Sequence, residues 1–98
     1  MNNFDYQQLD EIIHSRLRLA IIAVLISVEE AEFVFIKEKV NTSDGNLSVN
    51  LTKLEKVGYV SVKKQFLNRK PSSTYKLTKK GHEAFEVYVS QLEKLIKK

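Results

Sequence analysis

The stretch SDGNLSVNLTKLEKVGYV, residues 43–60, decides the fold that we expect for this chain. Its leucines recur at the three- and four-residue spacing of one buried helix face: Leu47, Leu51 and Leu54. Ser43 is a residue type that accepts hydrogen bonds from the free N–H groups of a first helical turn. Gly58 can adopt the left-handed conformation that ends many helices. The stretch therefore predicts a helix over residues 43–57, followed by a strand.

The side of this helix opposite the leucines is small, polar and basic. At about 100° per residue it carries Gly45, Val49, Thr52 and Lys56, flanked by Asn46, Ser48 and Lys53. Short side chains let a helix enter the major groove of DNA, where Asn can pair with adenine and Ser or Thr can reach base edges or phosphates. Asp44 argues against this, because a carboxylate repels phosphate unless it accepts from a cytosine amino group or only stabilises the helix end. The candidate DNA contacts are Ser43, Asn46, Ser48, Val49, Asn50, Thr52 and Lys53.

Beyond Gly58 the pattern changes from helical to alternating. Residues 59–63 and 73–77 are typical of two antiparallel strands. Residues 67–72, with a proline and polar side chains, predict a hairpin loop too long to be a tight turn. The hairpin carries four further candidate DNA contacts: Lys63, Lys64, Arg69 and Lys70. We expect its tip to contact phosphates, with Arg69 the residue most suited to a minor groove.

Three other helices are expected around this unit. Residues 9–28 are apolar around most of a helical circumference, with a break near His14 or Ser15. An acidic surface segment, residues 29–32, leads to a short second helix whose buried positions are Phe33, Ile36 and Val40. Residues 79–96 form a long last helix with an apolar stripe.

This order of elements resembles the winged helix-turn-helix regulators of the MarR and ArsR type. The residues that carry the resemblance are LDEIIHS (9–15) with Arg18, SDGNLSVNL (43–51), LEKVGYV (54–60), and Leu77-Thr78 with Gly81. The implied fold is mainly α, in the α+β class: a three-helix core, a two-stranded β-hairpin wing and a long C-terminal helix. It implies one winged-helix domain over residues 1–98, with the helix-turn-helix at about 33–57, the wing at about 59–77 and a dimerisation helix at about 79–96.

The resemblance also implies a function. It implies a transcriptional regulator that binds double-stranded DNA sequence-specifically as a homodimer, with a recognition helix in the major groove and the basic wing on the backbone or in the minor groove. The excess of apolar surface on the first and last helices supports a dimer, since a chain of 98 residues can hardly cover it alone. The expected interface residues are Leu17, Ile21, Ile22, Leu25, Phe85, Tyr88, Leu92, Leu95 and Ile96.

Composition narrows the class of protein. With no cysteine the chain needs no oxidising compartment, and we expect it in the cytoplasm. The N-terminus lacks the pattern of a secretory signal, and the longest apolar stretch, residues 17–28, is too short to span a bilayer, so no membrane partner is expected. Sixteen Lys and Arg against twelve Asp and Glu give a net charge of +4, which permits a polyanionic partner.

The sequence offers nothing that predicts an enzyme. It has no Ser-His-Asp order, carboxylate pair or phosphate-binding glycine loop, and no catalytic residue or cofactor is expected. His14 and His82 are isolated, so no metal site is expected either. A small-molecule effector in a dimer cleft is left open, although no residue argues for one. The alternative is a winged-helix module that binds another protein instead of DNA, with Phe35 and Phe66 as its exposed apolar candidates.

Overall fold

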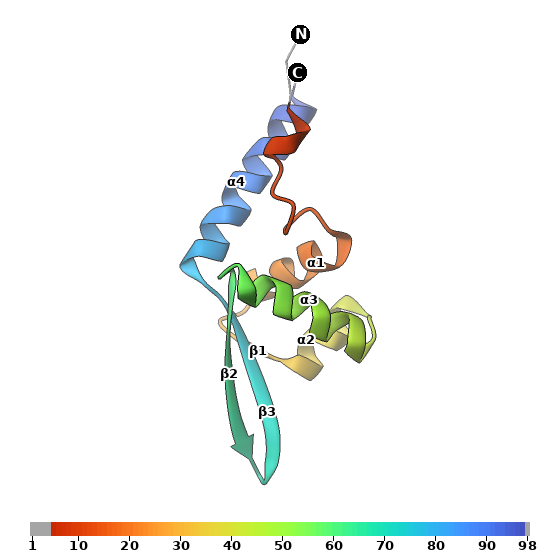
Figure 1. Ribbon diagram of the computed structural model, residues 1–98, viewed down its shortest axis with the longest axis vertical. Helices are drawn as coiled ribbons and strands as arrows, with labels where there is room; N and C mark the ends of the chain where they lie inside the picture. The colour runs from red at the N-terminus through yellow and green to blue at the C-terminus, as the bar shows by residue number, and fades with distance from the viewer. Residues whose placement is uncertain (1–4, 98) are drawn as a thin grey trace.

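The computed structural model describes residues 5–97. In chain order these residues form η1 (Tyr6–Gln8), α1 (Arg16–Ile26), β1 (Ala31–Glu32), α2 (Phe33–Val40), α3 (Asp44–Lys56), β2 (Val60–Leu67), β3 (Lys70–Leu77) and α4 (Lys79–Ile96). The molecule is elongated, with extents of 59 × 25 × 21 Å. The β2–β3 hairpin projects from one end of the helical body, and α4 extends toward the other (Figure 1).

The helix pair α2–α3 forms as the sequence predicts. α2 ends at Asn41, whose φ of 54° is left-handed. α3 begins directly after Ser43, whose Oγ accepts a hydrogen bond from the Asn46 N–H at 3.2 Å. Gly58 follows the helix with a φ of 84°, a conformation that glycine adopts at little cost. The buried residues of α3 are the three expected leucines, Leu47, Leu51 and Leu54.

The sheet is antiparallel with strand order β1-β3-β2, and the hairpin differs from the expected one. Its strands pair without interruption from Val60 opposite Leu77 to Leu67 opposite Lys70. The prediction of a long loop over residues 67–72 is therefore wrong. The connection is a two-residue turn, Asn68-Arg69, whose φ values of 53° and 63° are those of a type I′ turn.

Pro71 explains why this turn was missed. A proline usually interrupts a strand because it lacks an N–H for the ladder. Here it pairs with Phe66, one position from the turn-closing pair of Leu67 and Lys70. In a two-residue hairpin that neighbouring pair is the non-hydrogen-bonded one, so β2 needs no N–H from Pro71. The short strand β1 reaches only Thr74 and Tyr75 on the other side of β3, so no hydrogen bond of the ladder is lost there either.

β1 and the start of α1 also depart from expectation. The acidic segment 29–32 contains β1, in which Ala31 is buried and Glu32 accepts a hydrogen bond from Ser72 Oγ at 3.2 Å. The first helix begins at Arg16 instead of Leu9. Before it, Asp10 Oδ1 accepts from the N–H groups of Ile12 and Ile13, which closes a turn. The chain there buries Ile13 without being helical.

The core is shared by all helices and the sheet. Its buried residues are Ile13, Ile21, Ile22, Leu25, Ala31, Ile36, Leu47, Leu51, Leu54, Val60 and Tyr88. Four of the residues expected at a dimer interface, Ile21, Ile22, Leu25 and Tyr88, therefore lie in the core of a single chain. This corrects the expectation for these four, because a fully buried side chain presents no surface to a second copy.

The end of α3, the base of the hairpin and the start of α4 meet at Tyr59, and we call this place the Tyr59 junction. The Tyr59 carbonyl accepts from the Thr78 N–H at 3.0 Å, and Thr78 Oγ1 donates to the Gly58 carbonyl at 2.6 Å. The Tyr59 hydroxyl donates to the Asp10 carboxylate. Burial, together with this hydrogen bond, raises the pKa of Tyr59 to about 12. Gly81 in the first turn of α4 packs so close that an added Cβ would lie 2.2 Å from the Tyr59 carbonyl oxygen.

Candidate nucleic-acid interface

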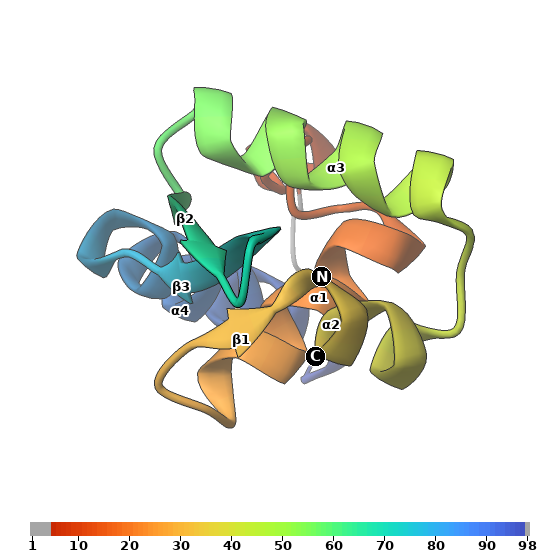
Figure 2. The same ribbon diagram turned by 90° about the horizontal axis from the view of Figure 1, so that it is seen from below.

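The polar side of α3 is open along its length. α3 runs along one edge of the molecule, with α1, α2 and the sheet on its inner side (Figure 2). The side chains on its outer side are all exposed: Asn46, Ser48, Val49, Thr52, Lys53 and Lys56, together with Gly45. An added Cβ at Gly45 would meet nothing within 4 Å, so the first turn of α3 presents bare backbone to the outside. A flat, polar and narrow helix face is what entry into a major groove requires.

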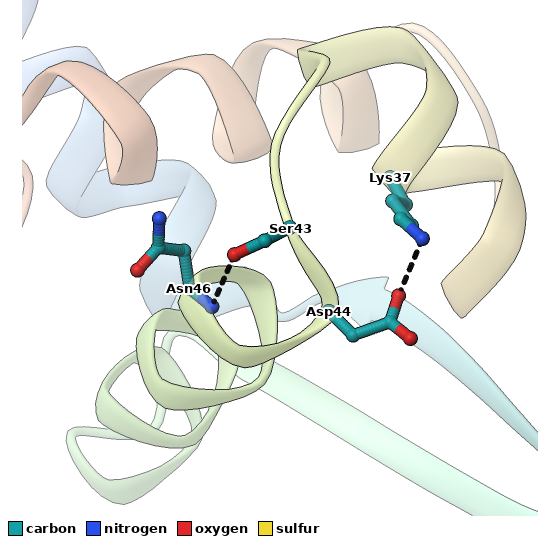
Figure 3. Close-up of polar contacts among 4 residues, drawn as sticks. All are labelled: Lys37, Ser43, Asp44 and Asn46. Carbon is teal, nitrogen blue, oxygen red and sulfur yellow. Dashed lines mark hydrogen bonds and ion pairs between the residues drawn. The ribbon is translucent and has the colours of Figure 1, made fainter.

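The N-terminus of α3 is capped by Ser43, and the one acidic residue of its first turn, Asp44, is paired with a lysine of α2. Lys37 Nζ of α2 lies 2.7 Å from Asp44 Oδ1, while Ser43 caps the same helical turn (Figure 3). The Lys37 ammonium offsets the Asp44 carboxylate, which reduces the repulsion of phosphate that the sequence alone raised as an objection. The Ser43 hydroxyl caps the helix, and the negative charge of Asp44 in the first turn interacts favourably with the helix dipole.

Asn50 is held by the protein itself. Its Oδ1 accepts from Arg18 Nη1 at 2.6 Å, and its Nδ2 donates to the Asn46 carbonyl at 2.8 Å. Arg18 also donates through Nε to the Ile12 carbonyl. The Oδ1 end of the Asn50 amide thus joins α3 to α1 and, through Arg18, to the N-terminal segment, while its Nδ2 end bonds back within α3. The structure gives this predicted contact residue a structural role, which sequence could not show because Arg18 is distant along the chain.

The hairpin brings the four predicted cations to one projecting ribbon. Lys63, Lys64, Arg69 and Lys70 are all exposed. Lys63 and Lys64 are consecutive in β2, so they point to opposite faces of the ribbon. Arg69 occupies the turn itself. A fifth cation, Lys76 of β3, is exposed nearer the base and was not among the predicted contacts.

Several of the apolar residues that remain uncovered lie on α4. Of the predicted interface residues, Leu95 and Ile96 are exposed, and Leu17, Phe85 and Leu92 are half-buried. Val87 and Val89 of α4 are exposed as well and were not predicted. Val89, Leu92 and Ile96 share one side of the second half of α4 at helical spacing, whereas Val87 lies on the opposite side.

Two other kinds of site are absent from residues 5–97. No three His, Cys, Asp or Glu side chains gather there as a metal site would require. Within the same residues, no helix combines the length and apolar character needed to cross a bilayer.

Two helices joined by a short turn, the second open on its polar side and followed by a basic hairpin, define a winged helix-turn-helix. Residues 17–96 match the model of the family described as winged helix DNA-binding domain. The chain belongs to this family.

Relatives and solved structures agree with this class. An uncharacterized protein of Methanocaldococcus jannaschii is 39% identical over 87 residues, which cover 89% of this chain and 95% of that protein. The structure of a transcriptional regulator homologue from Pyrococcus horikoshii superposes with a TM-score of 0.82 at 28% identity, covering 89% of this chain and 86% of that one. A MarR-family transcriptional regulator from Silicibacter pomeroyi shares the fold, with a TM-score of 0.65 at 17% identity over 84% of this chain and 54% of its own. Family and fold are thus those of transcriptional regulators and not of enzymes.

Proposed function

We propose that the protein binds double-stranded DNA sequence-specifically as a homodimer and thereby regulates transcription. The observation that carries the proposal is the exposed polar face of α3 on a chain whose hairpin is cationic on both faces. α3 enters the major groove, and the hairpin contacts the adjoining backbone or minor groove. Asn46, Ser48, Val49, Thr52 and Lys53 are the proposed contacts on α3. A regulator of this kind works where its DNA is, so we place the protein in the cytoplasm.

A second copy completes the proposed site. One recognition helix and one wing give limited affinity, whereas two copies related by a twofold axis read two half-sites about one helical turn apart. The apolar side of α4, with Val89, Leu95 and Ile96 exposed, supports this arrangement. Residues 79–96 then act as the dimerisation helix, as the sequence predicts.

The decisive experiment is selection of bound sequences from a random duplex pool at physiological salt. We expect a palindromic winner. Against it, Asn46→Ala, Lys53→Ala and Arg69→Ala each weaken binding, and the two cation variants also reduce the dependence of affinity on salt. Lys94→Ala is the matched control, because it removes one positive charge from the last turn of α4. Recovery of no enriched sequence, or equal losses for Lys94→Ala and Lys53→Ala, would contradict the proposal.

One observation favours the alternative, a module that binds another protein. Phe35 and Phe66, its two predicted candidates, are 39% and 75% exposed. The alternative requires negligible duplex affinity at physiological salt, so the same selection distinguishes the two functions.

A further inference from the structure

The hairpin combines a sequence without acidic residues with an exposed aromatic side chain; the acid beside it is Glu32 of β1, which accepts a hydrogen bond from Ser72 Oγ. Residues 60–77 contain five cations and no Asp or Glu, in a chain that has twelve acidic residues elsewhere: the cations are Lys63, Lys64, Arg69, Lys70 and Lys76. Such a ribbon attracts a polyanion and repels a basic surface. The other side chains of the hairpin are therefore expected to contact a polyanion.

Phe66 stands among these cations near the tip. Its side chain is 75% exposed, one residue before the turn-closing pair of Leu67 and Lys70. It lies on the same face of β2 as Val60, which is buried in the core, because side chains alternate along a strand. The third strand, β1, pairs with β3 only at Tyr75 and Thr74, so it does not reach the pair formed by Phe66 and Pro71. The core-facing side of the strand thus continues outward as an uncovered aromatic ring.

The ring is held on a stiff support. Pro71 lies opposite Phe66 in the pairing register, and the two-residue turn beyond them fixes both strands. Lys64 lies on the same face two residues before Phe66, and Arg69 is in the turn. Cations on either side bring phosphates close to the ring, and phosphates flank a narrow groove whose walls are sugars and stacked bases. An apolar side chain in that position can enter a base step, as the wedges of minor-groove binding proteins do.

We propose that Phe66 is an apolar wedge that enters the minor groove beside the α3 site and partly unstacks one base step. The inference rests on the proposed DNA-binding function and adds a second mode of recognition to it. Because unstacking costs least at flexible pyrimidine–purine steps, the wedge favours such steps beneath the wing without contacting their base edges. It therefore contributes specificity through the deformability of the flanking sequence.

The test uses the full chain and the duplex that it selects. Phe66→Ala removes the ring but no charge. We expect affinity to fall about tenfold, while the slope of affinity against salt stays that of wild type. Lys64→Ala, on the same face, is the opposite control: it lowers the magnitude of the slope by about 1. Leu67→Ala is the matched apolar control, since Leu67 is 46% exposed but lies on the other face of the strand, and we expect it to bind as wild type does.

Unstacking is measured directly with 2-aminopurine placed at each step beneath the wing. Wild type and Phe66→Trp raise its fluorescence at one step, and Phe66→Ala does not. Thermal unfolding and sedimentation of Phe66→Ala should match wild type, because an exposed side chain supports neither the core nor the self-association surface of α4.

Three outcomes would overturn the inference. The first is unchanged affinity and fluorescence with Phe66→Ala while wild type binds DNA, which leaves the proposed function intact. The second is a loss of affinity accompanied by a change in sedimentation, which assigns Phe66 to self-association. The third is a wild type that binds no duplex, which removes the proposed function as well.

Discussion

Two asparagines one helical turn apart show how strongly the surroundings decide what a residue does. Asn46 and Asn50 both lie on α3, and sequence marks both as DNA contacts. Asn50 is partly buried between the Arg18 guanidinium and the Asn46 carbonyl, whereas the Asn46 side chain is exposed. The sequence predicts which face of α3 is polar, because that follows from helical spacing. It cannot predict which polar residue at the edge of that face is taken by another helix.

This difference predicts opposite effects for the two alanine variants. Asn50→Ala should lower the free energy of unfolding by ~1–2 kcal/mol, because it strips a hydrogen-bond partner from a charged, partly buried Arg18. Asn46→Ala should change it by less than ~0.5 kcal/mol while weakening DNA binding by ~1–3 kcal/mol. Urea unfolding and titration of the selected duplex measure the two quantities. An Asn50→Ala variant as stable as wild type would show that the Arg18 contact contributes nothing.

At the scale of elements, the predictable parts are those whose signals are local. The caps Ser43 and Thr78 mark the starts of α3 and α4, since a cap acts within one turn. β1 was missed because two residues carry no periodicity, and its pairing with β3 depends on residues far along the chain. The tight turn was missed because Pro71 suggested a loop and because Arg69 occupies a left-handed position where glycine is usual. Long-range pairing and unusual backbone angles are what the sequence leaves undetermined.

The variant Arg69→Gly separates two effects of Arg69: the steric cost of its positive φ and the contribution of its charge to DNA binding. Glycine adopts a positive φ without the steric cost that arginine bears, so we expect Arg69→Gly to unfold at or above the temperature of wild type and above that of Arg69→Ala. Its DNA affinity should nevertheless fall, with a salt slope smaller in magnitude by about 1. Thermal scans and salt titrations provide the measurements. A glycine variant less stable than the alanine variant would mean that the turn is not strained.

The contact of α4 with the Tyr59 junction makes Gly81 intolerant of any side chain. A methyl group there would overlap the Tyr59 carbonyl oxygen, so Gly81→Ala should lower the free energy of unfolding by ~2–3 kcal/mol. Gly45→Ala is the control: its site is open, so stability should stay the same or rise by up to ~1 kcal/mol. Denaturant unfolding of both variants checks this, and equal stabilities would contradict the close packing.

At the scale of the whole molecule, the proposed DNA-binding and self-association surfaces are distributed along its length. The hairpin projects at one end and the second half of α4 at the other (Figure 1). Ile96 is 77% exposed and Val89 37% exposed on α4, and neither is needed by the core. In the proposed dimer, affinity for a palindrome and dimer stability are therefore linked through mass action and not through shared contacts.

The double variant Val89→Lys and Ile96→Lys should sediment as a monomer at micromolar concentration and keep its helical content. It should also lose the concentration dependence of its melting temperature that we expect of wild type. Val34→Lys on α2 replaces another exposed apolar residue, 62% exposed and away from α4, and should leave self-association unchanged. A wild-type chain that is itself monomeric at this concentration would remove the dimer from the proposed function.

The Tyr59 junction has a mechanical consequence. The hairpin, with eight residues in each strand, and α4, with eighteen residues, extend in opposite directions from this junction. The junction itself is held by short hydrogen bonds such as that from Thr78 Oγ1 to the Gly58 carbonyl. The hairpin is also held at a second place, because β1 pairs with Tyr75 and Thr74 and Glu32 bonds to Ser72. The arm beyond Thr74 is about four residues, or ~13 Å, long, so a tilt of about 5° there moves the tip by only ~1 Å. The positions of Arg69 and Phe66 therefore depend on β1 as much as on the junction.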